Sequence, residues 1–279
     1  MKILKKSIVS SARWFEGALF AILVGGLVFQ SQAQIYTLSQ NDSSAQIDTA
    51  STAGMFNWSV GGVNQLAQQW FWYRVGGSGP EASIDTITLT PLITQTLANK
   101  LTTTYANSSI SVKTAYTLLA PGNGTATMSE QITVMNTSAT SQDYHFFEYS
   151  DFDLGGVFSG QSVQFYNNGS SVYYEVKQAG ANGSVDETAN APGASSAEVQ
   201  AGYFPTIVNL LNDGLTTTLN NNLSAGPGDV TYAYQWDATL APGTSLLISK
   251  LISVPEPSAM ALIASGMLAL AWLRRRRAV

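Results

Sequence analysis

The sequence predicts an all-β protein whose body is an antiparallel β-sandwich, flanked at each end of the chain by an apolar helix. Runs of about four to ten residues, rich in β-branched and aromatic side chains, alternate with clusters of glycine, proline, asparagine and serine. The gaps between these runs do not have the helical spacing that parallel strands need for their crossover connections. With 279 residues, the chain is long enough for one large all-β domain or two small ones.

Ten runs are expected to form strands, and one segment is expected to be helical. The strand segments are residues 55–60, 69–75, 84–89, 110–119, 125–136, 144–152, 162–166, 172–177, 230–236 and 245–253. Residues 204–212 have the helical pattern. Asn168-Gly169 lies between two tyrosine-bearing runs and predicts a β-hairpin. Residues 180–196 and 220–228 have almost no large apolar side chains, and we expect them to be exposed loops.

Basic residues gather at the two ends of the chain, next to its two long apolar runs. Eight of the 13 lysines and arginines lie in the first 13 or the last six residues, which leaves five bases for the interior. Without Glu16 and Glu256, which adjoin the two basic ends, the interior holds sixteen of the 18 acids. Lysine and arginine beside an apolar helix stay on the cytoplasmic side of a membrane. The arrangement therefore predicts that both ends start in the cytoplasm while the acidic body crosses the inner membrane.

The N-terminal end has the three parts of a secretory signal peptide. A basic segment, residues 2–13, precedes an apolar run, residues 18–29, and small side chains occupy positions −3 and −1 of a cut between Ala33 and Gln34. Twelve apolar residues rise only ~18 Å as a helix, whereas the hydrocarbon core of a membrane is ~30 Å thick. We therefore expect the Sec machinery to export the chain and signal peptidase to remove residues 1–33. An uncleaved N-terminal anchor is the alternative.

The C-terminal end combines a proline motif, an uncharged apolar run and an arginine tail. The motif Pro255-Glu256-Pro257 cannot continue a strand ladder or a helix interior, so the folded body is expected to end there. Residues 259–273 would rise ~23 Å as a helix, and snorkelling arginines extend this reach. The tail, which fixes the terminus in the cytoplasm, consists of Arg274, Arg275, Arg276 and Arg277.

These three parts in this order resemble the PEP-CTERM sorting signal of Gram-negative bacteria, over residues 254–279. The resemblance implies that Pro255, Glu256 and Pro257 are recognised by exosortase, a transpeptidase-like membrane enzyme, and that the chain is processed nearby. It implies delivery to the cell surface or the exopolysaccharide matrix after transient anchoring by a transmembrane sorting helix. An ordinary C-terminal anchor behind a proline-rich hinge is the alternative. Bodies in this family vary widely, so the resemblance implies no activity for residues 34–253.

The composition excludes several kinds of site. A chain without cysteine has no disulfide, no thiolate zinc site and no cysteine nucleophile. The single histidine, His145, excludes any site that needs two imidazoles from one subunit. An isoelectric point near 4.8 without a basic block in the body argues against nucleic acid as a partner.

Trp70 and Trp72 lie in the densest aromatic run, residues 69–74. With the period of two of a strand, both indoles lie on one face. One hypothesis is a sugar-stacking platform, for which exopolysaccharide would be the ligand. The other is a central strand that is covered on both sides, and the run favours it because apolar residues occupy both faces.

Asp151 and Asp153 end an acidic run and precede a Leu-Gly-Gly turn. Ca²⁺ takes carboxylate and carbonyl oxygens at loops, so one hypothesis is a calcium site at these two aspartates. Their spacing does not match an EF-hand. Solvated turn carboxylates are the alternative.

Together these features predict an exported, non-catalytic protein of the surface or matrix, with a structural or adhesive role. A serine hydrolase would have to use His145, and no Gly-x-Ser-x-Gly elbow accompanies it. The alternative is a carbohydrate-binding or glycan-cleaving body that acts on exopolysaccharide. A glycosidase needs two carboxylates about 5–9 Å apart, and Glu148 with Asp151 or Asp153 is the first pair to consider.

Overall fold

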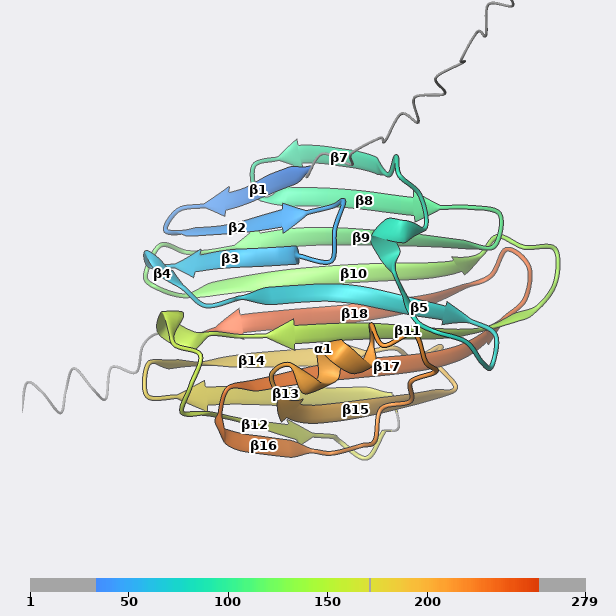
Figure 1. Ribbon diagram of the computed structural model, residues 1–279. Coiled ribbons are helices and arrows are strands. Elements are labelled where there is room, and N and C mark those ends of the chain that lie inside the picture. Colours follow the sequence, from blue (N-terminus) through green and yellow to red (C-terminus); the bar gives the residue numbers. More distant parts are fainter. Residues whose placement is uncertain (1–33, 171, 256–279) are drawn as a thin grey trace, which may run out of the picture. The chain divides into compact units, whose positions relative to one another are not determined.

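The computed structural model describes residues 34–170 and 172–255, which form two β-sheets packed face to face (Figure 1). The strand pairings are antiparallel, except for a short parallel contact between β3 (Gly54–Val60) and β5 (Gln68–Val75). The predicted all-β, antiparallel body is therefore confirmed. The expected signal helix and sorting helix lie outside the described residues, and within those residues no helix has the length and hydropathy to cross a membrane.

Nine of the described strands form the first sheet, called sheet A. They are β1 (Ile35–Gln40), β2 (Ser43–Asp48), β3, β4 (Val63–Asn64), β5, β6 (Ala82–Ser83), β11 (Gln142–Asp151), β15 (Ser196–Tyr203) and β17 (Val230–Leu240). The spatial order is β1-β2-β3-β5-β11-β17-β15, with β4 beside β3 and β6 beside β5. Strands β5, β11 and β17 therefore lie in the interior of the sheet.

The other nine described strands form sheet B. They are β7 (Leu92–Leu97), β8 (Lys100–Ala106), β9 (Ile110–Leu119), β10 (Ala126–Asn136), β12 (Gln161–Tyr166), β13 (Tyr173–Gly180), β14 (Gly183–Asn190), β16 (Ser224–Gly228) and β18 (Ser245–Val254). The spatial order is β16-β12-β13-β14-β18-β10-β9-β8-β7. The last strand of the body, β18, is thus paired on both sides, by β14 and β10.

Helical structure among the described residues is short. The predicted helix is confirmed as α1 (Thr206–Leu210), and the other two segments are 3₁₀ turns, η1 (Ile84–Thr86) and η2 (Leu154–Gly156). The prediction of a strand over residues 84–89 is therefore wrong. Ile84 and Ile87 are both buried, and because a 3₁₀ turn places residues three apart on one side, this spacing suits the turn.

The two expected loops are also wrong in part. Residues 180–196 contain β14, which pairs with β13 and β18, and residues 220–228 contain β16. In β14 the side chains of Val185, Glu187 and Ala189 are buried in alternation with half-buried polar ones. An interior strand of this sheet can therefore form with small or medium inward side chains, whereas the prediction assumed that a strand needs large apolar ones. The predicted hairpin at Asn168-Gly169 is confirmed, since β12 pairs with β13.

Aromatic side chains fill the space between the two sheets. On the inner face of sheet A, Phe71 stacks on Phe146 with ring centroids 5.7 Å apart, and Tyr234 stacks on Trp236 at 5.3 Å. Phe165 from sheet B meets Tyr234 edge-on at 5.3 Å. Such pairs add to the free energy gained from apolar burial, so this layer holds the sheets together.

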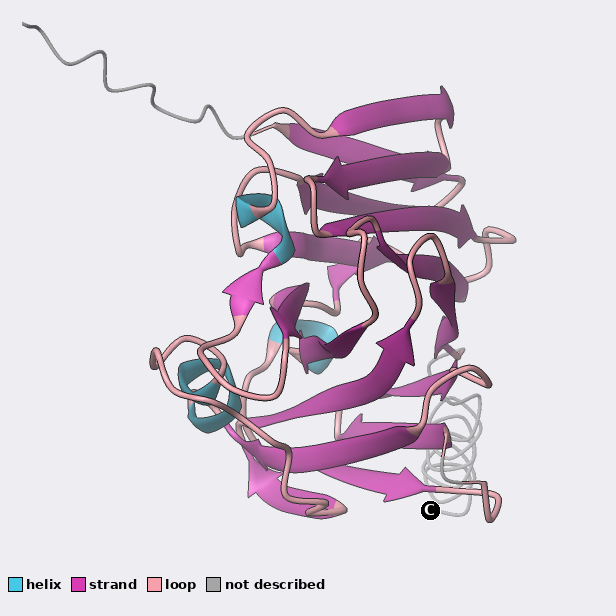
Figure 2. Cartoon of the chain, turned by 90° about the vertical axis from the view of Figure 1, so that its right-hand side faces the viewer, coloured by secondary structure: helices cyan, strands magenta, loops and turns pink. Residues whose placement is uncertain are grey.

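The outer face of the middle of sheet A is covered by other parts of the chain rather than by solvent. Trp72 Nε1 donates a hydrogen bond to Asn212 Oδ1 (3.2 Å), and Arg74 Nη1 donates to the backbone oxygen of Thr217 (2.8 Å). Arg74 also pairs with Glu81. Helix α1 belongs to this cover and lies outside the strands (Figure 2). Strand β5 is consequently buried on both faces.

Candidate functional sites

The structure places Trp70 and Trp72 on one face of β5, and that face is the covered one. Their exposed fractions are 1% and 0%. Trp70 Nε1 donates to Ser83 Oγ (2.8 Å), and the indole of Trp72 bonds Asn212. Neither ring offers a surface to a sugar, so the burial supports the covered strand that the sequence favours over the sugar-stacking platform.

Asp151 and Asp153, the two predicted metal ligands, are joined by a third carboxylate from elsewhere in the chain. Asp151 is the last residue of β11, Asp153 follows it in the loop, and Asp229 directly precedes β17. Strands β11 and β17 are antiparallel neighbours, so the end of one lies beside the start of the other. One carboxylate oxygen from each aspartate lies within 4.8 Å of the other two. We call these three residues the aspartate cluster.

Asp151 is the buried member of the aspartate cluster. Only 6% of it is exposed, and its Oδ1 is buried and has no hydrogen-bond partner within residues 34–170 and 172–255, while Tyr149 Oη donates to Oδ2 over 3.5 Å. Burial, with repulsion from the other two carboxylates, raises the pKa of Asp151 to about 7. Burial also raises the pKa of Asp153 and of Asp229. The raised pKa values show that three negative charges at this place repel one another and are poorly solvated. A bound cation would relieve both effects.

A second group of three carboxylates lies between the two sheets, around Lys250. Lys250 Nζ donates to Glu130 Oε2 (2.9 Å) and to Glu148 Oε1, and lies 3.3 Å from Glu187 Oε1. Gln69 Nε2 from sheet A donates to both Glu148 Oε1 (2.8 Å) and Glu130 Oε2 (3.2 Å). The four charged side chains are fully buried. We call Glu130, Glu148, Glu187 and Lys250 the glutamate cluster.

One ammonium cannot balance three carboxylates, and the pKa values of two of the three carboxyls are raised. Burial raises the pKa of Glu130, and burial together with the nearby Glu148 raises the pKa of Glu187 well above its usual range. The surrounding carboxylates raise the pKa of Lys250 despite its burial. The cluster is a closed internal network with a structural role. These residues were not predicted as a group from the sequence, although each of them stands at an inward position of its strand.

Glu148 and Asp151, the first carboxylate pair considered for a glycosidase, lie on opposite faces of β11. Glu148 points into the space between the sheets, where it meets Lys250. Asp151 is three residues further along β11 and therefore points to the opposite face. Glu148 and Asp151 cannot flank one glycosidic bond, and Asp153 belongs to the cluster with Asp151.

His145 has an acidic partner but no serine. Its Nδ1 lies 2.7 Å from Asp237 Oδ1, and its Nε2 is buried with no hydrogen-bond partner among the described residues. The hydroxyl of Ser196 donates to Asp237 Oδ2 (3.4 Å). A nucleophile would have to meet Nε2 instead, so this trio does not form a catalytic triad.

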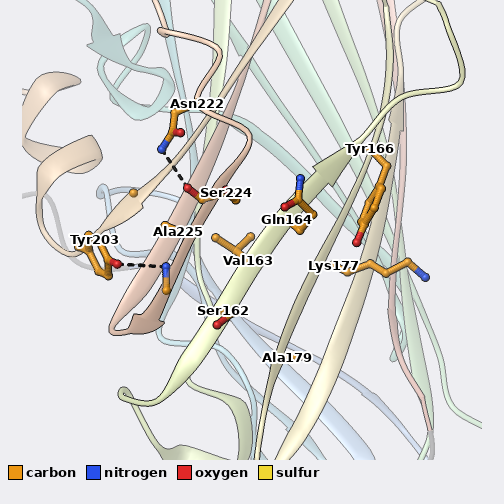
Figure 3. A pocket seen from close by; sticks show the side chains of 12 residues that line it. Ser162, Val163, Gln164, Tyr166, Lys177, Ala179, Tyr203, Asn222, Ser224 and Ala225 are labelled. Atoms are coloured by element: carbon orange, nitrogen blue, oxygen red, sulfur yellow. Dashed lines mark hydrogen bonds between the residues drawn. The ribbon is translucent and has the colours of Figure 1, made fainter.

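A groove of about 650 Å³, which was not predicted from the sequence, lies beside β12 and β16 (Figure 3). Tyr166 and Tyr203, each about half exposed, lie at opposite sides of it (Figure 3). Tyr203 Oη accepts a hydrogen bond from the backbone of Gly226 (3.2 Å). The polar side chains that line the groove are Ser162, Gln164, Lys177, Asn222 and Ser224. Exposed tyrosine rings flanked by amides and hydroxyls can bind the apolar faces and the hydroxyls of a sugar.

The predicted sorting motif starts where the last strand ends. Val254 is the final residue of β18, pairs with Ala126 and is buried, and Pro255 follows it directly. Glu256, Pro257 and the four arginines of the tail lie outside the described residues. At the other end, Gln34 is the first described residue and its carbonyl accepts from the backbone of Thr49 (3.1 Å), whereas Ala33 lies outside.

Comparison with known proteins identifies the C-terminal segment. The family model of the PEP-CTERM protein-sorting motif matches residues 253–277, so the chain carries this motif. The motif implies exosortase as the processing partner and export to the cell envelope or surface. No curated protein matches the sequence.

Similarity to solved structures concerns the body. A proposed aldose 1-epimerase from Escherichia coli K12 is 10% identical, with a TM-score of 0.50 over 81% of this chain and 100% of that one. A galactose mutarotase-like protein from Lactobacillus casei ATCC 334 is 8% identical, with a TM-score of 0.48 over 79% and 100%. A bacterial glucoamylase, solved with acarbose, is 10% identical, with a TM-score of 0.49 over 86% of this chain. This chain spans only 36% of the glucoamylase. At such identities the likeness concerns the fold alone.

Proposed function

Since the chain ends in a PEP-CTERM motif, we propose that it is an exported protein of the cell surface or extracellular matrix, sorted and processed by exosortase, with a non-catalytic sandwich body. In this proposal the Sec machinery exports the chain, signal peptidase cuts between Ala33 and Gln34, and the C-terminal helix anchors the body only until processing. The matched motif at residues 253–277 carries the proposal.

The position of the motif supports processing beside a folded body. Because β18 is paired on both sides up to Ser253, the recognised residues begin with no linker. Cleavage at or after Pro255 leaves every strand of sheet B intact, so the released product keeps its fold.

Deletion of the exosortase gene tests this proposal. We expect the deletion strain to accumulate a longer form in the membrane fraction, whereas the parent strain carries a shorter form at the surface or in the matrix. Replacement of Pro255, Glu256 and Pro257 by alanine in the parent strain should have the same effect. An unchanged length and location in the deletion strain would refute sorting by exosortase.

A carbohydrate-binding body is the second candidate, and the groove between Tyr166 and Tyr203 favours it. Exopolysaccharide of the matrix would be the ligand. We expect the full chain in detergent to bind glycans on an array, and the variant Tyr166→Ala/Tyr203→Ala to lose at least about tenfold in affinity. Phe158→Ala is the matched control, because Phe158 is an exposed aromatic residue outside the groove. Equal binding by both variants would exclude the groove.

A further inference from the structure

The aspartate cluster joins three parts of the chain that are distant in sequence. Asp151 ends β11, Asp153 lies in the loop that leads to η2, and Asp229 lies at the start of β17. A ligand held by all three carboxylates would tie the end of one interior strand to the start of its neighbour.

The buried carboxylate at the centre of the cluster lacks a partner. Asp151 is more than nine-tenths buried, and its Oδ1 has no hydrogen-bond donor in the described part of the chain. A buried carboxylate oxygen without a hydrogen-bond donor is unfavourable unless a cation or a proton compensates it. This orphan oxygen indicates that a ligand completes the site.

No basic side chain of the described residues forms an ion pair with this carboxylate. Among residues 34–170 and 172–255, the ion pairs of the basic residues involve other acids: Arg74 pairs with Glu81, Lys177 with Glu175 and Asp186, and Lys250 with the glutamate cluster. No ion pair of this region includes a member of the aspartate cluster.

The spacing of the oxygens fits a calcium ion. Ca²⁺ holds oxygen ligands at about 2.3–2.6 Å, so two ligands of one ion are at most about 5 Å apart. The three carboxylates already meet this limit, since their oxygens lie within 4.8 Å of one another. Mg²⁺ demands near-octahedral geometry and usually keeps several of its own waters, so a site built from three protein carboxylates suits Ca²⁺ better. Two of the carboxylates are half-buried, which leaves one side open for water ligands.

We propose that Asp151, Asp153 and Asp229 form a binding site for one Ca²⁺ ion, which fastens the end of β11 and its loop to the start of β17. Asp151 provides the buried anchor, and Asp153 and Asp229 close the site from the loop and from β17. Calcium sites of extracellular modules have a Kd of about 0.1–1 mM. An ion bound in this range would stabilise the body after export, where calcium is available.

Calcium titration of the full chain in detergent tests the site, with calorimetry as the readout of binding and thermal unfolding as the readout of stability. We expect one Ca²⁺ per chain with a Kd of about 0.1–1 mM, a rise in the unfolding temperature that saturates with binding, and at least about tenfold weaker binding of Mg²⁺. The variants Asp153→Asn and Asp229→Asn keep the size of the side chain and should each weaken calcium binding at least about tenfold.

Asp213→Asn is the matched control, because Asp213 is exposed and distant from the cluster in sequence. It should bind calcium as the unaltered chain does. The proposal would be overturned if the unaltered chain bound no Ca²⁺ at a concentration of about 5–10 mM. It would also be overturned if a folded Asp153→Asn/Asp229→Asn variant bound Ca²⁺ as tightly as the unaltered chain. Far-ultraviolet circular dichroism establishes that each variant is folded before titration.

Discussion

The glutamate cluster and the aspartate cluster each bring three carboxylates together, but they differ in the source of the balancing positive charge. The glutamates surround Lys250 between the two sheets, and all four side chains are fully buried. The aspartates lie where β11 ends and β17 begins, and two of them are half-buried. No ion pair of the described residues involves them. A closed interior must contain its own cation, because a free ion cannot enter it, whereas an open end can take a cation from solvent.

Among the variants that test this comparison, the loss of Lys250 should change the free energy of unfolding most. Lys250→Met leaves three buried carboxylates without a cation, and removing one partner of a buried ion pair costs about 3–5 kcal/mol. We expect the free energy of unfolding near pH 7, from urea denaturation, to fall by this amount.

Lys177→Met is the control for this measurement. Lys177 is half exposed and pairs with Glu175 and Asp186 at the surface, where solvent screens the charges, so its loss should leave the free energy of unfolding nearly unchanged. Equal losses for the two lysine variants would show that the glutamate cluster does not depend on its internal cation.

Giving the aspartate cluster a cation of its own should make it resemble the glutamate cluster. In the variant Asp229→Lys, an ammonium can approach Asp151 and Asp153. We expect the calcium response of the unaltered chain, about 1–3 kcal/mol at 10 to 100 times Kd, to disappear. The calcium-free variant should be at least as stable as the calcium-free unaltered chain, by urea denaturation. A variant that still gains stability from calcium would contradict this comparison.

The pH dependence of stability should show the protons that the glutamate cluster holds. The folded-state pKa of Glu187 is raised above its ordinary value of 4.5, so the folded state keeps a proton that the unfolded state has lost. Stability therefore falls as the pH rises above 4.5. Lys250, Glu130, Glu148 and the hydroxyl of Tyr232 face this carboxyl.

Glu187→Gln removes this titration and keeps an acceptor for Tyr232. Between pH 6 and pH 8, we expect the free energy of unfolding to fall less steeply for the variant than for the unaltered chain. The two slopes should differ by about 1 kcal/mol per pH unit or less. Glu175→Gln, an exposed control on β13, should leave the slope unchanged. Identical slopes for the unaltered chain and Glu187→Gln would mean that Glu187 holds no extra proton in the folded state.

The alternation within single strands indicates part of the glutamate cluster. In β18 the inward residues are Leu246, Ile248, Lys250 and Ile252, so a lysine stands where the alternation requires an apolar side chain. Glu130 has the same place between Met128 and Ile132 in β10. A charge at an inward strand position predicts a buried partner, although only the packing of the two sheets shows which residue it meets.

The aspartate cluster was predictable only in part. Asp151 and Asp153 are adjacent to a strand end, which the sequence shows, whereas Asp229 lies far along the chain. Asp229 joins the cluster only because β11 pairs with β17. The alternation of apolar and polar residues within a strand does not determine which distant strand it pairs with. The sandwich itself was predictable because many short runs and turns specify it locally, while β14 was missed because its inward side chains are small or polar.

The intact mass of the protein isolated from the surface of its native cells tests the export and processing proposal most directly. The account predicts a product that starts at Gln34, ends at or near Pro255-Glu256-Pro257 and lacks Arg274–Arg277. A surface product that still carries Met1 or the terminal Val279 would contradict it.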